Sequence, residues 1–259
     1  MFLPKVSILM NCFNGESYIS EAINSVLNQT YENWELIIWD NQSTDKSKDI
    51  IFSFNDNRIK YFLAESHTGL GKARQLASLK FLGQLIAFLD VDDIWMREKL
   101  EKQVREFHKK DVAICYSNTL FFSKKNKNIL YPKNYKNLLS TNSLITNYCL
   151  SLESLMISND KLKKLSYSFD PNFDHISDFD IMIRLSTLGK IVYIPEVLSG
   201  WRVHTTNESF LFHKKFFCEK EKWTALHLKE NFLSKYRDSI KELTLINQAF
   251  IRISNYSIR

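Results

Sequence analysis

The sequence has few cysteines and no long apolar run, and both absences limit what kind of protein it encodes. Its four cysteines, Cys12, Cys115, Cys149 and Cys218, lie far apart, and none belongs to a C-x-x-C pair. Neither a zinc knuckle nor a disulfide framework is therefore indicated, and a reducing, cytoplasmic location is expected. A stretch of about eighteen apolar residues is also missing, so the sequence predicts no membrane-spanning helix.

Neither a signal peptide nor a nucleic-acid-binding module is expected. The segment MFLPKVSILMNCF contains Pro4 and Lys5 and has no small-residue cleavage site, so we expect a first strand there. The net charge of +6 suits nucleic acid, an anionic membrane surface or a phosphate-bearing substrate. Because the basic residues form no stripe with interleaved aromatic residues in a recognisable module, nucleic acid is not an expected partner.

The apolar residues that are present follow an alternating pattern. The chain has 259 residues and is 44% hydrophobic, which suits one large domain or one domain with a modest extension. We expect strands at residues 5–10, 34–40, 59–65, 85–90 and 112–117, and helices at 18–30, around 50, after 69 and at 97–109. Wholly apolar strands that alternate with helices predict an α/β fold, with a mostly parallel sheet flanked by helices.

Polar residues follow several of these strands. They are Asn11, Asn14, Asp40, Asn41 and the three aspartates Asp90, Asp92 and Asp93. Ligands of parallel sheets bind beyond the carboxyl ends of the strands, so we expect these residues to gather on one rim.

The three aspartates repel one another unless a cation lies between them. A few protein oxygen ligands suit Mn²⁺ or Mg²⁺, which take their other ligands from substrate phosphates and water. The D-x-D spacing places Asp90 and Asp92 on the same side of an extended segment. We expect Asp92 to bind the metal, Asp90 to reach the ribose or the metal shell, and Asp93 to cap the next helix. A solvated turn is the alternative.

The pattern changes after Ser117. The following segment is basic, rich in asparagine and irregular, and we expect a surface loop there. A helix at 176–188, a strand at 190–198 and a mostly helical tail from Asn207 complete the chain. We expect a catalytic domain at 1–206, with a nucleotide-binding half at about 1–117 and an acceptor-side half at about 118–206, and a helical C-terminal extension at 207–259.

Four segments in this order resemble the family 2 glycosyltransferases. They are VSILMNCFNGESYISEAINSVLNQTYENWELIIWDNQSTD, then GLGKARQLA, then IAFLDVDDIW, and then FDPNFDHISDFDIMIRLSTLGKIVYIPEVLSGWRVH. Together they span roughly residues 5–205. The resemblance implies a Rossmann-like GT-A fold, a nucleoside-diphosphate-sugar donor, inverting transfer, and Mn²⁺ or Mg²⁺ as cofactor.

The resemblance also implies donor-binding residues. Phe13 stands where the family stacks an aromatic ring on the nucleobase, with a core phenylalanine as the alternative, and Asn11 is a neighbouring candidate. WDNQSTD corresponds to the family's D-D-G-S-T-D, so Asp40 and Asn41 are candidates for the base edge, unless Asp40 forms a turn. The planar fork of Arg74 suits a diphosphate.

Further roles come from the glycines before Arg74 and from the last matching segment. Gly69 and Gly71 are expected to let the backbone approach a ligand at the start of a helix. HISDFD matches a segment where the family commonly has Glu-Asp, and Asp178 is the implied general base. Asp180 is expected to stabilise the helix start or to contact the acceptor. GWRVH resembles the family's aromatic-Arg-x-His, in which Arg202 pairs with phosphate and His204 is a metal ligand or a phosphate contact.

Two other functions stay open at this point. A sugar-1-phosphate nucleotidyltransferase has a similar sheet and uses metal, but it needs a glycine-rich basic loop where this chain has NCFNGESY. A non-catalytic sugar-nucleotide-binding protein is supported by the departures Asn41, His67 and Ser177 from the family pattern.

The expected partners are a nucleoside-diphosphate sugar, with UDP favoured, and a glycan or lipid-linked glycan of surface polysaccharide biosynthesis. The tail segment FLFHKKFFCEKEKW mixes phenylalanine with lysine. It is a candidate for peripheral contact with the inner face of a membrane. Packing as a helical subdomain or as a homodimer contact through the C-terminal helices is the alternative.

Overall fold

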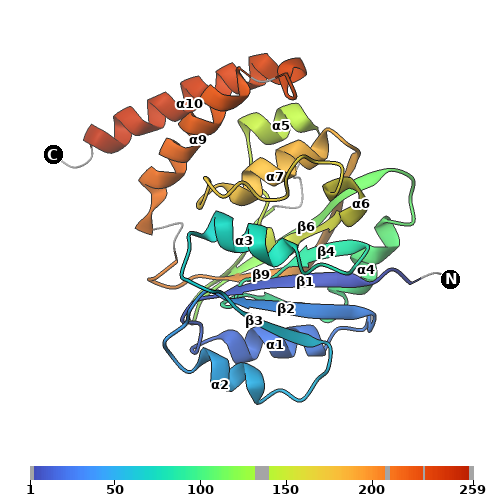
Figure 1. The fold of residues 1–259 in the computed structure, drawn as a ribbon. Helices are drawn as coiled ribbons and strands as arrows, with labels where there is room; N and C mark the ends of the chain where they lie inside the picture. Colours follow the sequence, from blue (N-terminus) through green and yellow to red (C-terminus); the bar gives the residue numbers. More distant parts are fainter. Residues whose placement is uncertain (1–2, 132–139, 208–210, 230, 257–259) are drawn as a thin grey trace.

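The fold is that of a computed structural model, which describes residues 3–131, 140–207, 211–229 and 231–256. Within this part, one sheet has the strand order β3-β2-β1-β4-β8-β6-β9-β5, and β7 pairs with β6 (Figure 1). The strands are β1 Val6–Cys12, β2 Trp34–Asp40, β3 Ile59–Leu63, β4 Leu85–Phe88, β5 Ile94–Trp95, β6 Val112–Phe122, β7 Lys127–Ile129, β8 Leu155–Ser158 and β9 Lys190–Arg202. Strands β1 to β4 are parallel, as are β6 and β9, whereas β8, β5 and β7 run antiparallel to their neighbours. The predicted α/β fold is confirmed.

Helices cover both faces of the sheet. They are α1 Ile19–Leu27, α2 Ser47–Phe52, α3 Leu70–Ser78, α4 Lys99–Glu106, α5 Thr141–Thr146, α6 Asn159–Leu162, α7 Ser177–Ser186, α9 His213–His227 and α10 Arg237–Tyr256, with short 3₁₀ turns η1 Leu152–Ser154 and η2 Ser234–Tyr236. Every residue of β2 and β4 is buried, which requires apolar cover on both sides. The α1 and α4 helices share one hydrophobic cluster with the sheet, and α3, α5 and α7 share the other.

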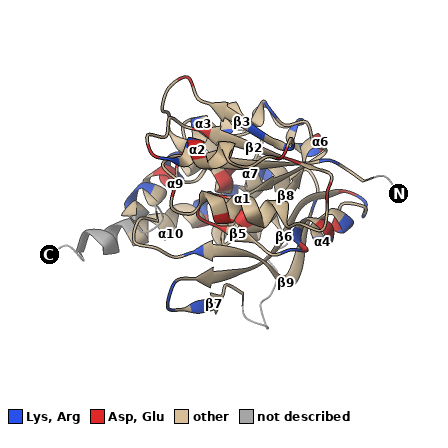
Figure 2. Ribbon diagram, turned by 90° about the horizontal axis from the view of Figure 1, so that it is seen from below, with Lys and Arg blue, Asp and Glu red and all other residues tan. Residues whose placement is uncertain are grey.

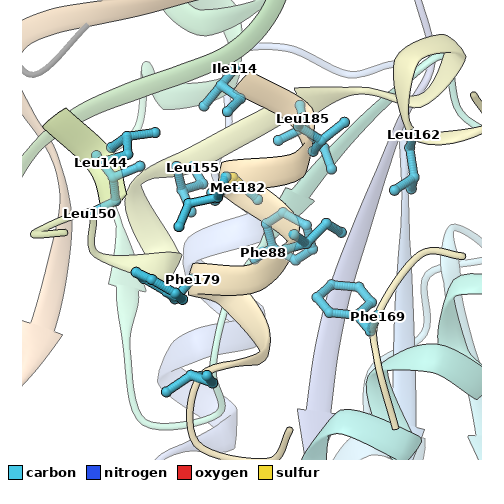
Figure 3. Close-up of a cluster of buried hydrophobic side chains, with 14 of the residues drawn as sticks. Phe88, Ile114, Leu144, Leu150, Leu155, Leu162, Phe169, Phe179, Met182 and Leu185 are labelled. Carbon is cyan, nitrogen blue, oxygen red and sulfur yellow. The ribbon is translucent and has the colours of Figure 1, made fainter. Parts of the chain in front are cut away.

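The second cluster places α7 firmly on the sheet. Figure 3 shows Phe179, Met182 and Leu185 of α7 among side chains from β4, β6, β8 and α5. All three are at most 1% exposed. Burial of a side chain of this size stabilises the fold by about 1.5–3 kcal/mol. Helix α7 is therefore a rigid support for any group at its N-terminus.

Strand β6 is longer than expected. A surface loop was expected after Ser117, but β6 continues to Phe122 and forms a hairpin with β7. The apolar residues Leu120 to Phe122 pair with Gly200 to Arg202 of β9, after register shifts near Asn118. This pairing places the end of β9 beside the loop that follows β4. Residues 132–139, also part of the expected loop, lie outside the described residues.

The helical tail packs on α7. The buried Asp180 of α7 accepts a hydrogen bond from Trp223 Nε1 of α9 at 2.9 Å and pairs with Arg184 at 2.5 Å. Burial alone would raise the pKa of Asp180, but His227, Arg184 and Trp223 together hold it below its ordinary value. Because Asp180 is 0% exposed, it fastens α7 to α9 and does not reach an acceptor.

Charge on the surface is mixed. In Figure 2, which views the molecule from below, Lys and Arg are interspersed with Asp and Glu. Exposed ion pairs such as Lys102–Glu98 on α4 add little to stability, so the two hydrophobic clusters hold the fold together. In the described part of the chain, none of the helices combines the length and the apolar character needed to cross a bilayer.

Candidate active site

A cavity of about 570 Å³ lies beyond the carboxyl ends of β1, β2 and β4. Seven of the predicted site residues line it, namely Asn11, Phe13, Asn41, Arg74, Asp90, Asp92 and Asp178. Three others, Asp40, Arg202 and His204, lie behind or beside the lining. The gathering of polar residues on one rim follows from the parallel register, in which Cys12 pairs with Asp40 and Leu9 with Phe88.

The end of β1 presents one aromatic ring and one amide to the cavity. Phe13 is 50% exposed, which excludes the alternative of a core phenylalanine. Its ring centroid lies 4.4 Å from that of His67, tilted by 49°. Both polar atoms of the Asn11 side chain are buried and find no hydrogen-bond partner among the described residues. Because buried polar groups are nearly always paired, this amide is suited to a polar ligand in the cavity.

The two residues that end β2 are engaged with the protein itself. Asp40 is 1% exposed and accepts hydrogen bonds from Ser43 N and Tyr61 Oη, both at 2.7 Å. The turn-forming alternative therefore describes Asp40. The Asn41 amide donates to Thr68 O at 2.7 Å and accepts from Thr68 N at 3.1 Å, so it holds the loop before α3.

Two departures from the family pattern, Asn41 and His67, lie beside one another. His67 Nδ1 is 2.9 Å from Asn41 O, so the histidine is part of the same contact as Asn41 and Thr68. Gln42, where the family has glycine, has a φ of 71°. This left-handed conformation favours glycine, and here the Gln42 amide donates to Ala64 O.

The glycines before Arg74 make room for the protein's own chain. A Cβ on Gly71 would lie 2.3 Å from Phe173 O, and one on Gly69 would lie 2.3 Å from Asp174 Oδ1. Asp174 accepts a hydrogen bond from Gly71 N at 3.0 Å, so a carboxylate of the chain already occupies the N-terminus of α3. The loop before α7 therefore fills the space beside both glycines. Gly69 also lines the cavity, so its expected contact with a ligand stays a prediction.

Gly71→Ala should destabilise the protein by about 1–3 kcal/mol, because its Cβ meets a fixed carbonyl oxygen. Alanine in a helix would ordinarily stabilise it by about 1 kcal/mol, so the sign of the change is informative. Gly15→Ala is the matched control, since its Cβ would meet only Val91 side-chain atoms at 3.1 Å. Urea unfolding of both variants measures the difference, and an unchanged or higher free energy of unfolding for Gly71→Ala would contradict the packing described.

The D-x-D segment and the end of β9 come together. Asp92 Oδ2 lies 2.8 Å from His204 Nε2, and Asp90 Oδ1 lies 3.6 Å from Arg74 Nη2. Arg202 donates to the Asp92 carbonyl at 2.7 Å and to Glu21 Oε2 at 2.5 Å. Its guanidinium thus holds the Asp92 backbone, and Arg202 does not line the cavity.

Asp93 does not cap a helix, contrary to expectation, because strand β5 follows it and α4 begins only at Lys99. Asp93 is 1% exposed and accepts a hydrogen bond from Arg202 N at 2.8 Å. Burial and the charges of Glu153, Asp92 and Asp90 raise the pKa of Asp93 well above its ordinary value. Its role is to join the D-x-D segment to β9.

The N-terminus of α7 completes the cavity. Tyr148 Oη donates to Asp178 Oδ2 at 3.0 Å, and Arg74 Nη1 donates to Ser177 Oγ at 2.7 Å. Arg74 is 6% exposed and so connects the Asp90 side of the cavity to α7. Ser177, where the family commonly has glutamate, is the hydrogen-bond partner of this arginine.

Residues of the C-terminal helix α9 and the segment just before it also line the cavity, which the sequence did not predict. Phe212, Lys215 and Phe216 lie in the wall together with His175, whose ring centroid is 5.3 Å from that of Phe216. No motif marks these residues, because the family resemblance ends near residue 205. The only available signal was the aromatic and basic composition of the tail.

A sheet of this order, with a D-x-D segment and a helix N-terminal carboxylate around one cavity, defines a glycosyltransferase with the GT-A fold. The chain belongs to Glycosyl transferase family 2, whose sequence model matches residues 7–170. The predicted family, fold class and enzyme class are thereby confirmed, and neither of the two other functions is supported. The matched segment ends before α7, so Asp178 and the C-terminal helices lie beyond it.

Known relatives agree with this assignment. The chain is 35% identical over 223 residues to UDP-Glc:alpha-D-GlcNAc-diphosphoundecaprenol beta-1,3-glucosyltransferase WfgD of Escherichia coli, covering 85% of each chain. The crystal structure of S. aureus TarS 1-349 in complex with UDP-GlcNAc superposes with a TM-score of 0.76 at 18% identity, over 98% of this chain and 76% of that one. Mannosyltransferase PcManGT from Pyrobaculum calidifontis, in complex with GDP-Man and Mn²⁺, gives a TM-score of 0.70 at 15% identity, over 95% and 72% of the two chains. At these identities the two structures support the fold alone.

Proposed function

We propose that the protein is a metal-dependent inverting glycosyltransferase. It moves a sugar from a nucleoside-diphosphate sugar, with a UDP-sugar favoured, to a hydroxyl group of a glycan or lipid-linked glycan in surface polysaccharide biosynthesis. The observation that carries the proposal is that one cavity holds both Asp92, after β4, and Asp178, at the start of α7. The name of the E. coli relative, with UDP-Glc and a diphosphoundecaprenol-linked GlcNAc, supports this donor and acceptor class.

In this proposal the donor lies along the β1 and β4 side of the cavity. Phe13 stacks on the base, and Asn11 supplies an amide with both a donor and an acceptor for the base or ribose. Arg74 faces the diphosphate with its planar guanidinium. Asp178, oriented by Tyr148, takes the proton of the acceptor hydroxyl as that oxygen attacks the anomeric carbon from the side opposite the diphosphate.

Asp92 and His204 fit Mn²⁺ or Mg²⁺. Their donor atoms are 2.8 Å apart, so the two side chains could hold one ion, and a carboxylate oxygen is a ligand that these ions prefer. Among the described residues, no group of three acidic, histidine or cysteine side chains could hold a metal ion, and the expected contact of Asp90 with the metal shell stays a proposal. A bound ion would supply positive charge opposite the leaving diphosphate.

A thermal-shift series tests the nucleotide and metal parts of the proposal. With Mn²⁺, UDP at about 100 times its Kd should stabilise the native state by about 2.7 kcal/mol, and less when EDTA replaces the metal. GDP, dTDP and CMP are the comparison ligands, and the largest shift identifies the base. The proposal fails if none of these nucleotides raises the melting temperature in the presence of Mn²⁺ or Mg²⁺.

The predicted division at residue 206, the membrane contact and the homodimer remain proposals. Large apolar side chains are exposed on or near the C-terminal helices at Leu211, Leu226, Leu245 and Phe250. They support an additional contact there, either with lipid or with a second copy of the chain.

A further inference from the structure

The helix α9 holds the segment that leads into α7. The Glu219 carboxylate accepts hydrogen bonds from three consecutive backbone amides, those of Asp174 at 3.3 Å, His175 at 2.8 Å and Ile176 at 3.2 Å. Helix α7 begins at the next residue, and its N-cap Ile176 supplies no side-chain cap. Glu219 therefore pairs the amide of the N-cap and the two amides before it, and its negative charge lies at the positive end of the helix dipole.

The same helix contacts the residues that follow Asp178. Lys220 Nζ lies 5.2 Å from the centroid of the Phe179 ring, and Trp223 of α9 bonds to Asp180. Burial lowers the pKa of Lys220, and the negative charge of Asp178 acts in the opposite direction. Helix α9 therefore contacts the residues both before and after Asp178 in the sequence.

The segment 174–176 is fixed at its other side by α3. Asp174 accepts the Gly71 amide hydrogen bond, while its own amide donates to Glu219. The approach of Asp174 to α3 is close enough that Gly69 has no room for a Cβ. Movement of this segment would therefore shift the start of α7, and Asp178 with it.

We propose that Glu219 is a positioning residue of the transfer reaction, which sets the place of Asp178 by holding residues 174–176. The inference rests on the proposed function, because the position of Asp178 matters for transfer only if Asp178 is the base. It makes α9 a working part of the acceptor side of the site and not a separate extension. A displacement of about 1 Å in a reacting group can cost about 100-fold in rate.

Two substitutions at Glu219 test the proposal, with Glu221→Ala on the same helix as the matched control. Glu219→Ala should lower kcat by about 10- to 100-fold, with a smaller change in the KM for the nucleotide sugar, because the hydrogen bonds of Glu219 go to residues 174–176 and not to a proposed donor-binding residue. Glu219→Gln keeps an oxygen acceptor and should recover part of kcat. Glu221→Ala should behave as the wild type. A lower melting temperature of Glu219→Ala with an unchanged kcat would show a purely structural cap and would overturn the proposal.

Hydrogen exchange of the amides of residues 174–176 gives a readout that needs no activity. These amides should be protected in the wild type and in Glu221→Ala, and should exchange faster in Glu219→Ala. If the wild type transfers no sugar but the amides follow this pattern, the proposed function fails, although Glu219 does hold residues 174–176. If the wild type transfers sugar and the amides are unprotected, the proposal about Glu219 is wrong.

Discussion

Asp178→Asn should lower the rate of sugar transfer by about 10²- to 10⁴-fold, the usual contribution of a general base. The amide of asparagine cannot take the proton of the acceptor hydroxyl, but it has nearly the same shape as the carboxyl. Its oxygen can still accept the hydrogen bond that Tyr148 Oη makes at 3.0 Å. The variant should therefore keep its fold and should still be stabilised by UDP with Mn²⁺. Steady-state transfer assays and thermal shifts with the same preparation measure both properties.

Asp180 provides the matched contrast for this prediction. It lies two residues further along α7, is 0% exposed, and pairs with Arg184 and Trp223. Removing one partner of a buried ion pair typically costs about 3–5 kcal/mol. The main effect of Asp180→Asn should therefore be a lower free energy of unfolding. If Asp178→Asn transfers sugar at the wild-type rate, Asp178 is not the base.

The strands and helices of residues 1–117 were predictable because their signals are local. Apolar runs such as residues 34–40 are buried on both faces of the sheet, and the periodic apolar residues of 19–27 form the buried face of α1. Parallel register then places the ends of β1, β2 and β4 on the same rim. The position of the cavity could therefore be derived from the pattern of residues alone.

The individual roles within the site were harder to predict. Asp40 ends β2 and Asn41 follows it, but their hydrogen bonds go to Ser43, Tyr61 and Thr68. Such choices depend on which neighbours a side chain meets in space. Asn41 and His67 replace family residues, and for this reason the sequence left a non-catalytic function open. In the structure the two replacements contact each other, so they form one local arrangement.

The part played by α9 could not be predicted, because Glu219 and the amides it binds are more than 40 residues apart. No periodicity links a carboxylate on one helix to the loop before another. The prediction of a loop after Ser117 was wrong for a related reason. The apolar residues at the end of β6 form a strand because β9 offers them a partner, and strand propensity depends on such context.

Asp92→Asn should remove the metal-dependent part of nucleotide binding. Asp92 Oδ2 and His204 Nε2 are 2.8 Å apart, and asparagine can keep this contact while losing the negative charge that attracts a divalent cation. The thermal shift with UDP and Mn²⁺ should fall to the value that the wild type gives with UDP and EDTA. Transfer should fall by about 10³-fold, equivalent to about 4 kcal/mol of lost transition-state stabilisation, because the diphosphate would leave without its counter-charge.

The control for this prediction is Glu98→Gln, which removes an exposed carboxylate a few residues away that pairs with Lys102. It should leave both the thermal shift and the transfer rate unchanged. His204→Gln should weaken the Mn²⁺-dependent shift as Asp92→Asn does, since the two side chains are proposed to share one ion. Asp92→Asn and Asp178→Asn should therefore differ in kind, because only the former loses nucleotide binding. A full Mn²⁺-dependent shift in Asp92→Asn would show that the metal is bound elsewhere.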